Sequence, residues 1–163
     1  GEGGWGRLGG DDAAVSRRQL SEGQQMVSRL APYCEESATS GWERVGVELD
    51  LQVALGRALL RGRVDRLERD GKGGLRVVDL KTGSNKPSKA ELVHDAQLGA
   101  YQVAVEQGAF ADVGTIAAGA ALLQVGKAAG VKSTLQERQP CAGDDDPWWD
   151  AAGVADTAES SRG

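Results

Sequence analysis

The chain has 163 residues, of which 40% are hydrophobic and 26% charged, and its formal net charge is −5. That length allows one domain with a core of its own but not two full domains, and the composition is that of a soluble globular protein. The sequence contains no run of about 18 apolar residues, so it predicts no membrane span. The Gly-rich N-terminus lacks the basic and then apolar segments of a signal peptide. We therefore expect a cytoplasmic protein and, because the chain does not begin with Met, either a fragment of a longer protein or a processed chain.

Charge is unevenly distributed along the chain. Residues 56–89 contain ten Lys and Arg against four Asp and Glu, a local charge of +6, whereas both flanks are acidic. A face that binds phosphate groups would explain this segment. The alternative is a solvated strand surface whose arginines protect a sheet edge, and charge alone favours this alternative.

The N-terminal part predicts one helix and one strand. Residues 1–14 are Gly-rich and aperiodic, so we expect them to be disordered or added by cloning, with the folded domain spanning residues 15–141. Loosely helical apolar spacing predicts a helix from Val15 to about Tyr33, which Pro32 should help to end. Residues 45–53 alternate strictly between apolar and polar side chains, as a half-buried strand does.

Two further strands follow. Residues 59–67 predict the second strand, and the Gly-rich segment 69–74 predicts a hairpin loop to a third strand at residues 75–81. This third strand is apolar on both faces except at Asp79 and Lys81, which is typical of a central strand. A charged pair in a central strand costs free energy unless it is partnered, so these two residues indicate a functional site.

A helix should follow the third strand. Ser88 and Glu91 have the spacing of a capping box, and the helix should run to about Gln107, with Gly108 just beyond its end.

The last element with a clear signal is an apolar segment at residues 117–125, which predicts a fourth strand. Residues 142–163 are acidic and rich in small residues, so we expect a frayed tail with Trp148 and Trp149 as a packing anchor. The expected order is helix, strand, strand, strand, helix, strand. This order predicts an α/β fold with a mixed central sheet flanked by helices.

The residues that carry chemistry are Asp65, Asp79 and Lys81. Side chains alternate along a strand, so Asp79 and Lys81 point the same way. If the segment that holds Asp65 pairs beside them, two carboxylates converge on one cation next to an ammonium group. Such oxygen ligands suit Mg²⁺ or Mn²⁺, and the lysine can orient or deprotonate a water molecule for phosphodiester hydrolysis.

Three segments in order resemble a known family: GRVDR at residues 62–66, VVDLKTG at 77–83 and QLGAY at 97–101. They resemble the RecB-type nuclease domain of the PD-(D/E)XK superfamily, with its restriction-endonuclease-like fold. Residues 42–125 look most like the C-terminal nuclease domain of actinobacterial UvrD/RecB-like helicase–nucleases of the AdnAB kind. Each motif alone is weak, but the three together are specific.

The resemblance implies roles by position. Asp65 and Asp79 would be metal ligands, joined by the backbone carbonyl of Leu80, and Lys81 would be the catalytic lysine. Two residues match the helix motif of the family, Gln97 and Tyr101; four residues apart, they lie on one helical face.

Further residues carry weaker expectations. Glu48 falls where the family often has an acidic residue, which gives it a supporting role in the metal site. We expect Arg63, Arg66, Lys86 and Tyr101 to contact DNA.

Two departures from the family concern histidine and cysteine. Relatives commonly use a histidine upstream of these motifs, whereas the only histidine here, His94, follows the lysine strand. Cys34 and Cys141 are more typical of reduced thiols than of a structural disulfide, and two thiols cannot hold an iron–sulfur cluster, which usually takes four.

The resemblance implies a metal-dependent nuclease domain that cleaves single-stranded DNA ends within a helicase–nuclease of DNA repair and recombination. Its partners would be the helicase domain of the same parent chain and a second helicase–nuclease subunit, and its location the cytoplasm, at the nucleoid. Because no GxxxxGK[ST] loop is present, ATP binding would belong to the parent chain. Two alternatives stay open: a catalytically incomplete module that binds DNA or docks a subunit, and a metal-dependent hydrolase with another substrate.

Overall fold

The computed structural model describes residues 5–93, 95–130 and 132–140, with side chains from residue 16 onward apart from residue 93. The elements in chain order are α1 (Trp5–Thr39), β1 (Glu43–Leu55), β2 (Ala58–Arg69), β3 (Gly74–Lys81), α2 (Lys89–Val93), α3 (Ala96–Glu106), β4 (Ile116–Gln124), the short 3₁₀ helix η1 (Lys127–Ala129) and β5 (Thr134–Arg138). Among the described helices, none combines the length and the apolar character needed to cross a membrane.

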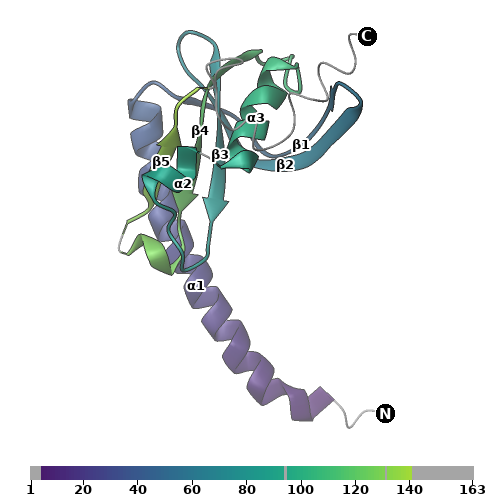
Figure 1. Ribbon diagram of the computed structural model, residues 1–163. Coiled ribbons are helices and arrows are strands. Elements are labelled where there is room, and N and C mark those ends of the chain that lie inside the picture. Colours follow the sequence, from purple (N-terminus) through teal and green to yellow (C-terminus); the bar gives the residue numbers. More distant parts are fainter. Residues whose placement is uncertain (1–4, 94, 131, 141–163) are drawn as a thin grey trace.

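The five strands form one mixed sheet in the order β1-β2-β3-β4-β5. Neighbouring strands run antiparallel except β3 and β4, which are parallel. A parallel pair needs a crossover connection, and α2 and α3 supply it here (Figure 1). The expected mixed sheet with flanking helices is therefore confirmed.

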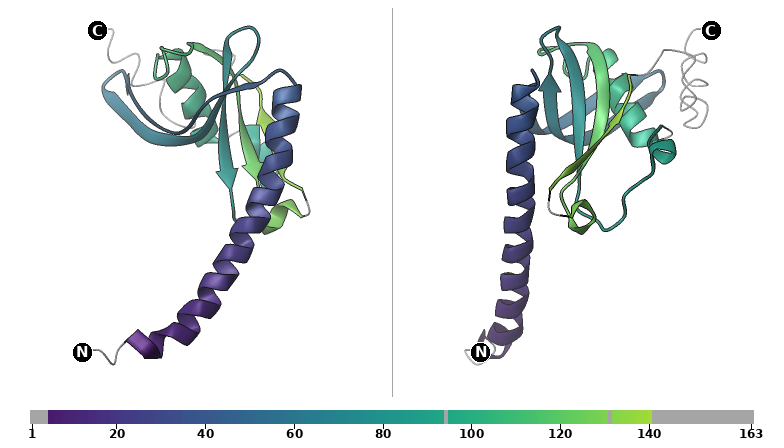
Figure 2. Two further views of the ribbon diagram at one scale, coloured as in Figure 1. Left: turned by 180° about the vertical axis from the view of Figure 1, so that it is seen from behind. Right: turned by 90° about the vertical axis from the view of Figure 1, so that its left-hand side faces the viewer.

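Helices cover both faces of the sheet, as Figure 2 shows. On one face α3 packs over a core that includes Leu67, Val77 and Leu98. On the other face α1 packs over a second core that includes Tyr33 and Val78. Because Val77 and Val78 belong to different cores, β3 alternates as a central strand covered on both sides does.

α1 is longer than expected at both ends. Residues 5–14, expected to be disordered, belong to this helix, and Pro32 lies inside it. Tertiary contacts explain the C-terminal extension, because Tyr33 and Ser37 both bind Glu68 of β2 through hydrogen bonds of 2.8 and 2.6 Å. These anchors outweigh the one helical hydrogen bond that Pro32 cannot make.

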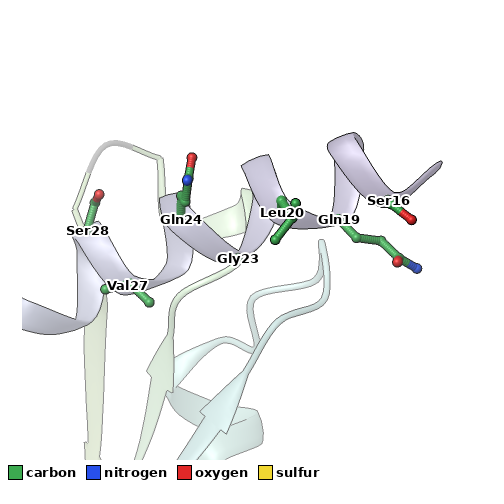
Figure 3. Close-up of a pocket in the computed structure, with 7 residues that line it drawn as sticks. All are labelled: Ser16, Gln19, Leu20, Gly23, Gln24, Val27 and Ser28. Atoms are coloured by element: carbon green, nitrogen blue, oxygen red, sulfur yellow. The ribbon is translucent and has the colours of Figure 1, made fainter. Parts of the chain in front are cut away.

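The N-terminal half of α1 extends beyond the sheet (Figure 1). Along this helix Leu20 and Val27 are each 66% exposed. They line a shallow groove along the helix, drawn in Figure 3, together with Ser16, Gln19, Gly23, Gln24 and Ser28.

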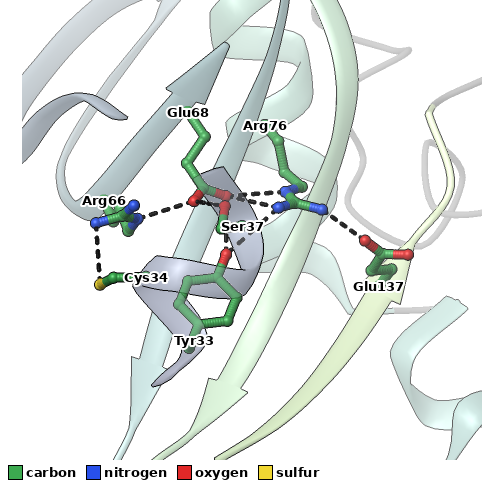
Figure 4. Close-up of polar contacts among 7 residues, drawn as sticks. All are labelled: Tyr33, Cys34, Ser37, Arg66, Glu68, Arg76 and Glu137. Atoms are coloured by element: carbon green, nitrogen blue, oxygen red, sulfur yellow. Dashed lines mark hydrogen bonds and ion pairs between the residues drawn. The ribbon is translucent and has the colours of Figure 1, made fainter. Parts of the chain in front are cut away.

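A buried charged network attaches the C-terminal half of α1 to the sheet (Figure 4). The carboxylate of Glu68 is fully buried and accepts hydrogen bonds from Arg66 Nε at 2.9 Å and from Arg76 Nη2 at 2.7 Å. Burial alone would raise the pKa of Glu68, but the hydrogen bonds from Ser37, Arg76, Arg66 and Tyr33 lower it. Burial, with help from Glu68, raises the pKa of Tyr33 to about 12, so the Tyr33 hydroxyl keeps its proton at neutral pH.

The connection between β3 and β4 confirms two predictions and corrects one. Ser88 and Glu91 form the capping box, in which Ser88 N donates to Glu91 Oε2 at 2.7 Å and Glu91 N donates to Ser88 Oγ at 3.2 Å. Gly108 has φ of 90° just past the end of α3. The single expected helix is instead two, because Asp95 caps a new one by accepting a hydrogen bond from Leu98 N at 2.9 Å.

The hairpin of β1 and β2 is longer than the strands beside it. β2 pairs with β3 only from Arg66 to Arg69, so its first part pairs with β1 alone. Figure 1 shows this part of the hairpin passing β3 and curving beneath α3. Its apolar face packs against the core under α3, through residues such as Leu51 and Val64.

Candidate active site

β3 places Asp79 and Lys81 on the face that α3 covers. Val77 packs in the core under α3, and side chains alternate, so Asp79 and Lys81 continue that face toward the end of the strand. Asp79 is 7% exposed. The side chain of Lys81 is 43% exposed and lies at the margin of the site.

β2 places Asp65 beside Asp79. The β2–β3 ladder pairs Arg66 with Val78, and one step further along the same register sets Asp65 opposite Asp79. Asp65 Oδ2 accepts a hydrogen bond from Leu80 N at 2.7 Å, so this side chain takes the place of the next backbone partner where β2 leaves β3. The end of the ladder thus brings two carboxylates together.

The charges of these three residues are coupled. Lys81 Nζ lies 2.8 Å from Asp79 Oδ2. Burial, reinforced by the Asp65 carboxylate, raises the pKa of Asp79 although the ammonium group of Lys81 opposes the shift. The hydrogen bond with Asp79 raises the pKa of Lys81, which therefore stays protonated at neutral pH. Two carboxylates facing each other favour a bound cation, since a cation relieves their repulsion.

The donor set fits a divalent metal ion. Asp79 Oδ2 is buried and has no well-aligned hydrogen-bond donor in the described part of the chain, although the ammonium group of Lys81 is close. Asp65 accepts the hydrogen bond from Leu80 N with Oδ2 alone. Hard oxygen ligands of this kind, with water or phosphate oxygens completing the shell, are what Mg²⁺ prefers. Asp65 and Asp79 act as a pair in this respect: among the side chains that the structure describes, no group of three or more His, Cys, Asp or Glu residues could hold a metal.

α3 adds a tyrosine and a glutamine to the site. Gln97 Nε2 donates to the Tyr101 hydroxyl at 3.0 Å, and that hydroxyl donates to the Arg63 carbonyl at 3.2 Å. Burial, together with the negative charge of Asp79 and Asp65, raises the pKa of Tyr101, so its hydroxyl stays neutral and donates to the Arg63 carbonyl. The expected one-sided placement of Gln97 and Tyr101 agrees with this geometry.

Other residues expected in the site lie elsewhere. Glu48 is an exposed residue of β1 with φ of 48°, and among the described residues it forms no metal-binding group with the two aspartates. Arg66 is 8% exposed and bound to Glu68 on the face covered by α1, so our expectation that it contacts DNA was wrong. The local sequence around Arg66 gave no sign that Glu68 would be its buried partner. Arg63 is exposed and pairs with Asp50 at 2.9 Å.

The remaining candidates divide into exposed and undescribed residues. Lys86 is exposed in the loop after β3. His94, Cys141, Trp148 and Trp149 lie outside the described residues. Cys34 is a partly buried free thiol that accepts a hydrogen bond from Arg66 Nη1 at 3.6 Å.

Two residues near the site were not anticipated. Asp95 caps α3 and its negative charge helps to raise the pKa of Lys81. Gln124 is 2% exposed at the end of β4 and binds the backbone after Lys81. A polar residue closing an otherwise apolar strand was the available signal for Gln124, and an aspartate three residues before Leu98 was the signal for Asp95.

Comparison with known proteins identifies the family. The family model of the PD-(D/E)XK nuclease superfamily matches residues 4–159. A search of curated proteins found no match. One of the matching solved structures is the crystal structure of SSO0001, with 16% identity, a TM-score of 0.40, and coverage of 96% of this chain and 68% of that chain. Nucleases of this superfamily generally use divalent metals, and their restriction-endonuclease-like α/β fold is the one observed here. The chain therefore belongs to the PD-(D/E)XK nuclease superfamily.

Proposed function

We propose that this domain is a Mg²⁺- or Mn²⁺-dependent deoxyribonuclease that hydrolyses single-stranded DNA. The observation that supports this most is the meeting of Asp65 and Asp79 at the end of the β2–β3 ladder, with Lys81 Nζ 2.8 Å from Asp79. Two carboxylates beside a partly exposed ammonium group suit phosphodiester hydrolysis.

Each residue has a role in this reaction. Asp65, Asp79 and the Leu80 carbonyl would hold the metal ion, which when bound polarises the phosphate and acidifies water. Lys81 positions the attacking water and offsets the negative charge that develops on the phosphate. Tyr101, held by Gln97, would orient the neighbouring phosphate.

The wider setting belongs to the same proposal. The three motifs resemble the RecB-type domain of helicase–nucleases, which supports a role in DNA repair and recombination, with a helicase domain in the parent chain and a second subunit as partners. Single-stranded DNA leaving the motor would be the substrate, in the cytoplasm at the nucleoid. Backbone contacts from exposed cations such as Arg63 and Lys86 would give strong salt sensitivity and little sequence preference.

Lys81→Ala tests the mechanism. We expect cleavage of labelled single-stranded DNA in Mn²⁺ to be abolished while the circular dichroism spectrum of the folded chain is kept. Lys72→Ala, in the turn before β3, is the matched control and should cut at the rate of the wild-type chain. A Lys81→Ala protein that also cuts at that rate would refute the assigned role of Lys81.

A second candidate is a nuclease fold kept as a DNA-binding or docking surface. It is favoured by the absence of a third carboxylate or histidine beside Asp65 and Asp79 among the described residues. If the unchanged chain binds DNA but neither binds Mn²⁺ nor cuts, this candidate replaces the first.

A further inference from the structure

Two glutamine side chains hold the loop that joins β3 to α2. Gln124 Nε2 donates to the Gly83 carbonyl at 2.6 Å, and Gln136 Nε2 donates to the Pro87 carbonyl at 2.8 Å. The first donor is almost fully buried. In Figure 1 the loop leaves the end of β3 and leads to α2, which packs against β5. Loop residues 83–87 are therefore fixed near both ends.

The loop lies on the same face of the sheet as the candidate active site. In the β3–β4 ladder Lys81 is paired with Gln124 and Asp79 with Leu122, and in the β4–β5 ladder Leu122 is paired with Gln136. Paired residues on neighbouring strands point to the same side. Neighbouring strands are about 4.8 Å apart, so the backbones of Gln124 and Gln136 lie about 5 and 10 Å across the sheet from β3, which carries Asp79 and Lys81.

The loop presents positive charge to solvent. Lys86 and Lys89 are exposed, and no carboxylate occurs between Lys81 and Glu91. In the part of the chain that the structure describes, neither lysine forms an ion pair. The Glu91 carboxylate is engaged by Ser88 N in the capping box.

We propose that this segment, from Gly83 to Lys89, is a phosphate-binding rim in which Lys86 and Lys89 bind the backbone of the nucleic-acid strand next to the phosphate being cleaved. Gln136 is a positioning residue that holds the rim in place. Because the loop continues directly from Lys81 at the end of β3, the rim would contact phosphates that flank the cleaved one. This inference rests on the proposed nuclease function, to which it adds how the substrate is held.

The salt dependence of DNA binding tests the rim. Affinity of the full chain for a labelled single-stranded oligonucleotide is measured between 50 and 200 mM NaCl with a metal chelator present. Each phosphate contact on a single strand contributes about 0.7 to the slope of log affinity against log salt, so Lys86→Gln with Lys89→Gln should lower its magnitude by about 1.4. The affinity lost over this salt range should then be about 7-fold smaller.

Lys72→Gln is the matched control, because Lys72 is also an exposed lysine and lies in the hairpin turn before β3. It should leave the slope unchanged. A double variant with the original slope, or a control that changes the slope as much as one rim lysine, would overturn the proposal.

The role of Gln136 is tested by coupling. Gln136→Met keeps the volume of the side chain and removes the donor to Pro87, so the rim lysines should lose their fixed position. In that background the two lysine substitutions should cost at least 3-fold less affinity than in the unchanged chain, a non-additivity expected only of interacting residues. Additive losses would refute the positioning role.

Cleavage of the same oligonucleotide by the unchanged chain in Mn²⁺ separates the two proposals. If the chain cuts and the lysines leave the slope unchanged, the rim fails and the nuclease function stands. If the slope changes as expected but neither the wild-type chain nor any variant cleaves the oligonucleotide, the rim stands as a DNA-binding surface and the nuclease function fails.

Discussion

Replacing Glu68 by Gln should destabilise the protein strongly, although the two side chains have nearly the same size. The Glu68 carboxylate is fully buried and accepts five hydrogen bonds, which come from Tyr33, Ser37, Arg66 and twice from Arg76. The side chains of Arg66 and Arg76 are only 10% and 6% exposed. A glutamine amide would leave both guanidinium groups buried without the charge of Glu68 and would turn a donor toward one of them.

The magnitude follows from the burial of the network. Breaking a buried ion pair by removing one partner costs about 3–5 kcal/mol, because the remaining charge is uncompensated. For a chain of 163 residues, each kcal/mol shifts the melting temperature by about 2–4 °C, so the expected decrease is about 6–20 °C. Glu137→Gln is the control: Glu137 binds Arg76 Nη1 at 2.6 Å, but its side chain is 51% exposed, so its loss should cost about 0–1 kcal/mol.

Urea unfolding followed by circular dichroism measures both variants against the unchanged chain. A loss from Glu68→Gln of less than about 1 kcal/mol, or one equal to that of Glu137→Gln, would refute the account of how α1 is attached to the sheet.

Three other outcomes follow from the same contacts. The pKa of Glu68 is lowered in the folded state, so the contribution of its ionised form to folding stability is present above the ordinary pKa of 4.5 and is lost as pH falls below that value. Acid unfolding of Glu68→Gln should therefore lack this part of the pH dependence. Identical stability-against-pH profiles of the variant and the wild-type chain would contradict this. Tyr101→Phe removes the hydroxyl that joins Gln97 to the Arg63 carbonyl. Cleavage should slow about 10- to 100-fold, and the free energy of unfolding should fall by only about 1 kcal/mol. An unchanged single-turnover rate would exclude Tyr101 from the site. Gly126→Ala would drive its Cβ into the Thr82 carbonyl, which should cost about 1–3 kcal/mol and lower cleavage by displacing the end of β3, while Gly71→Ala, with open space around it, should melt as the unchanged chain does.

The fold was largely predictable because its signals are local. Strict alternation marked β1, the apolar run interrupted by Asp79 and Lys81 marked β3, and the capping box marked the start of α2. The pairing of β2 with β3 also followed from a short Gly-rich hairpin, so the sequence alone could place Asp65 next to Asp79. The sequence pattern therefore predicts the three central residues of the site, Asp65, Asp79 and Lys81.

What escaped prediction depends on contacts between distant residues. Arg66 looked like an exposed strand arginine, but its guanidinium is buried by Glu68 and by α1, which starts more than 50 residues earlier. β5 is short and lacks apolar alternation, so it forms only because β4 offers a free edge. The carbonyl oxygens that Gln124 and Gln136 bind lie on a loop about 40 to 50 residues away, a separation at which local patterns carry no information.

The central claim is that Asp65 and Asp79 form a metal-dependent cleavage site complete within this chain. Mn²⁺-dependent cleavage of labelled single-stranded DNA, compared between this chain and Asp79→Ala, tests it most directly, with calorimetric Mn²⁺ titration of the same samples. We predict cleavage and Mn²⁺ binding by the unchanged chain and the loss of both in the variant. Equal cleavage by the two proteins, or no Mn²⁺ binding by either, would contradict the claim.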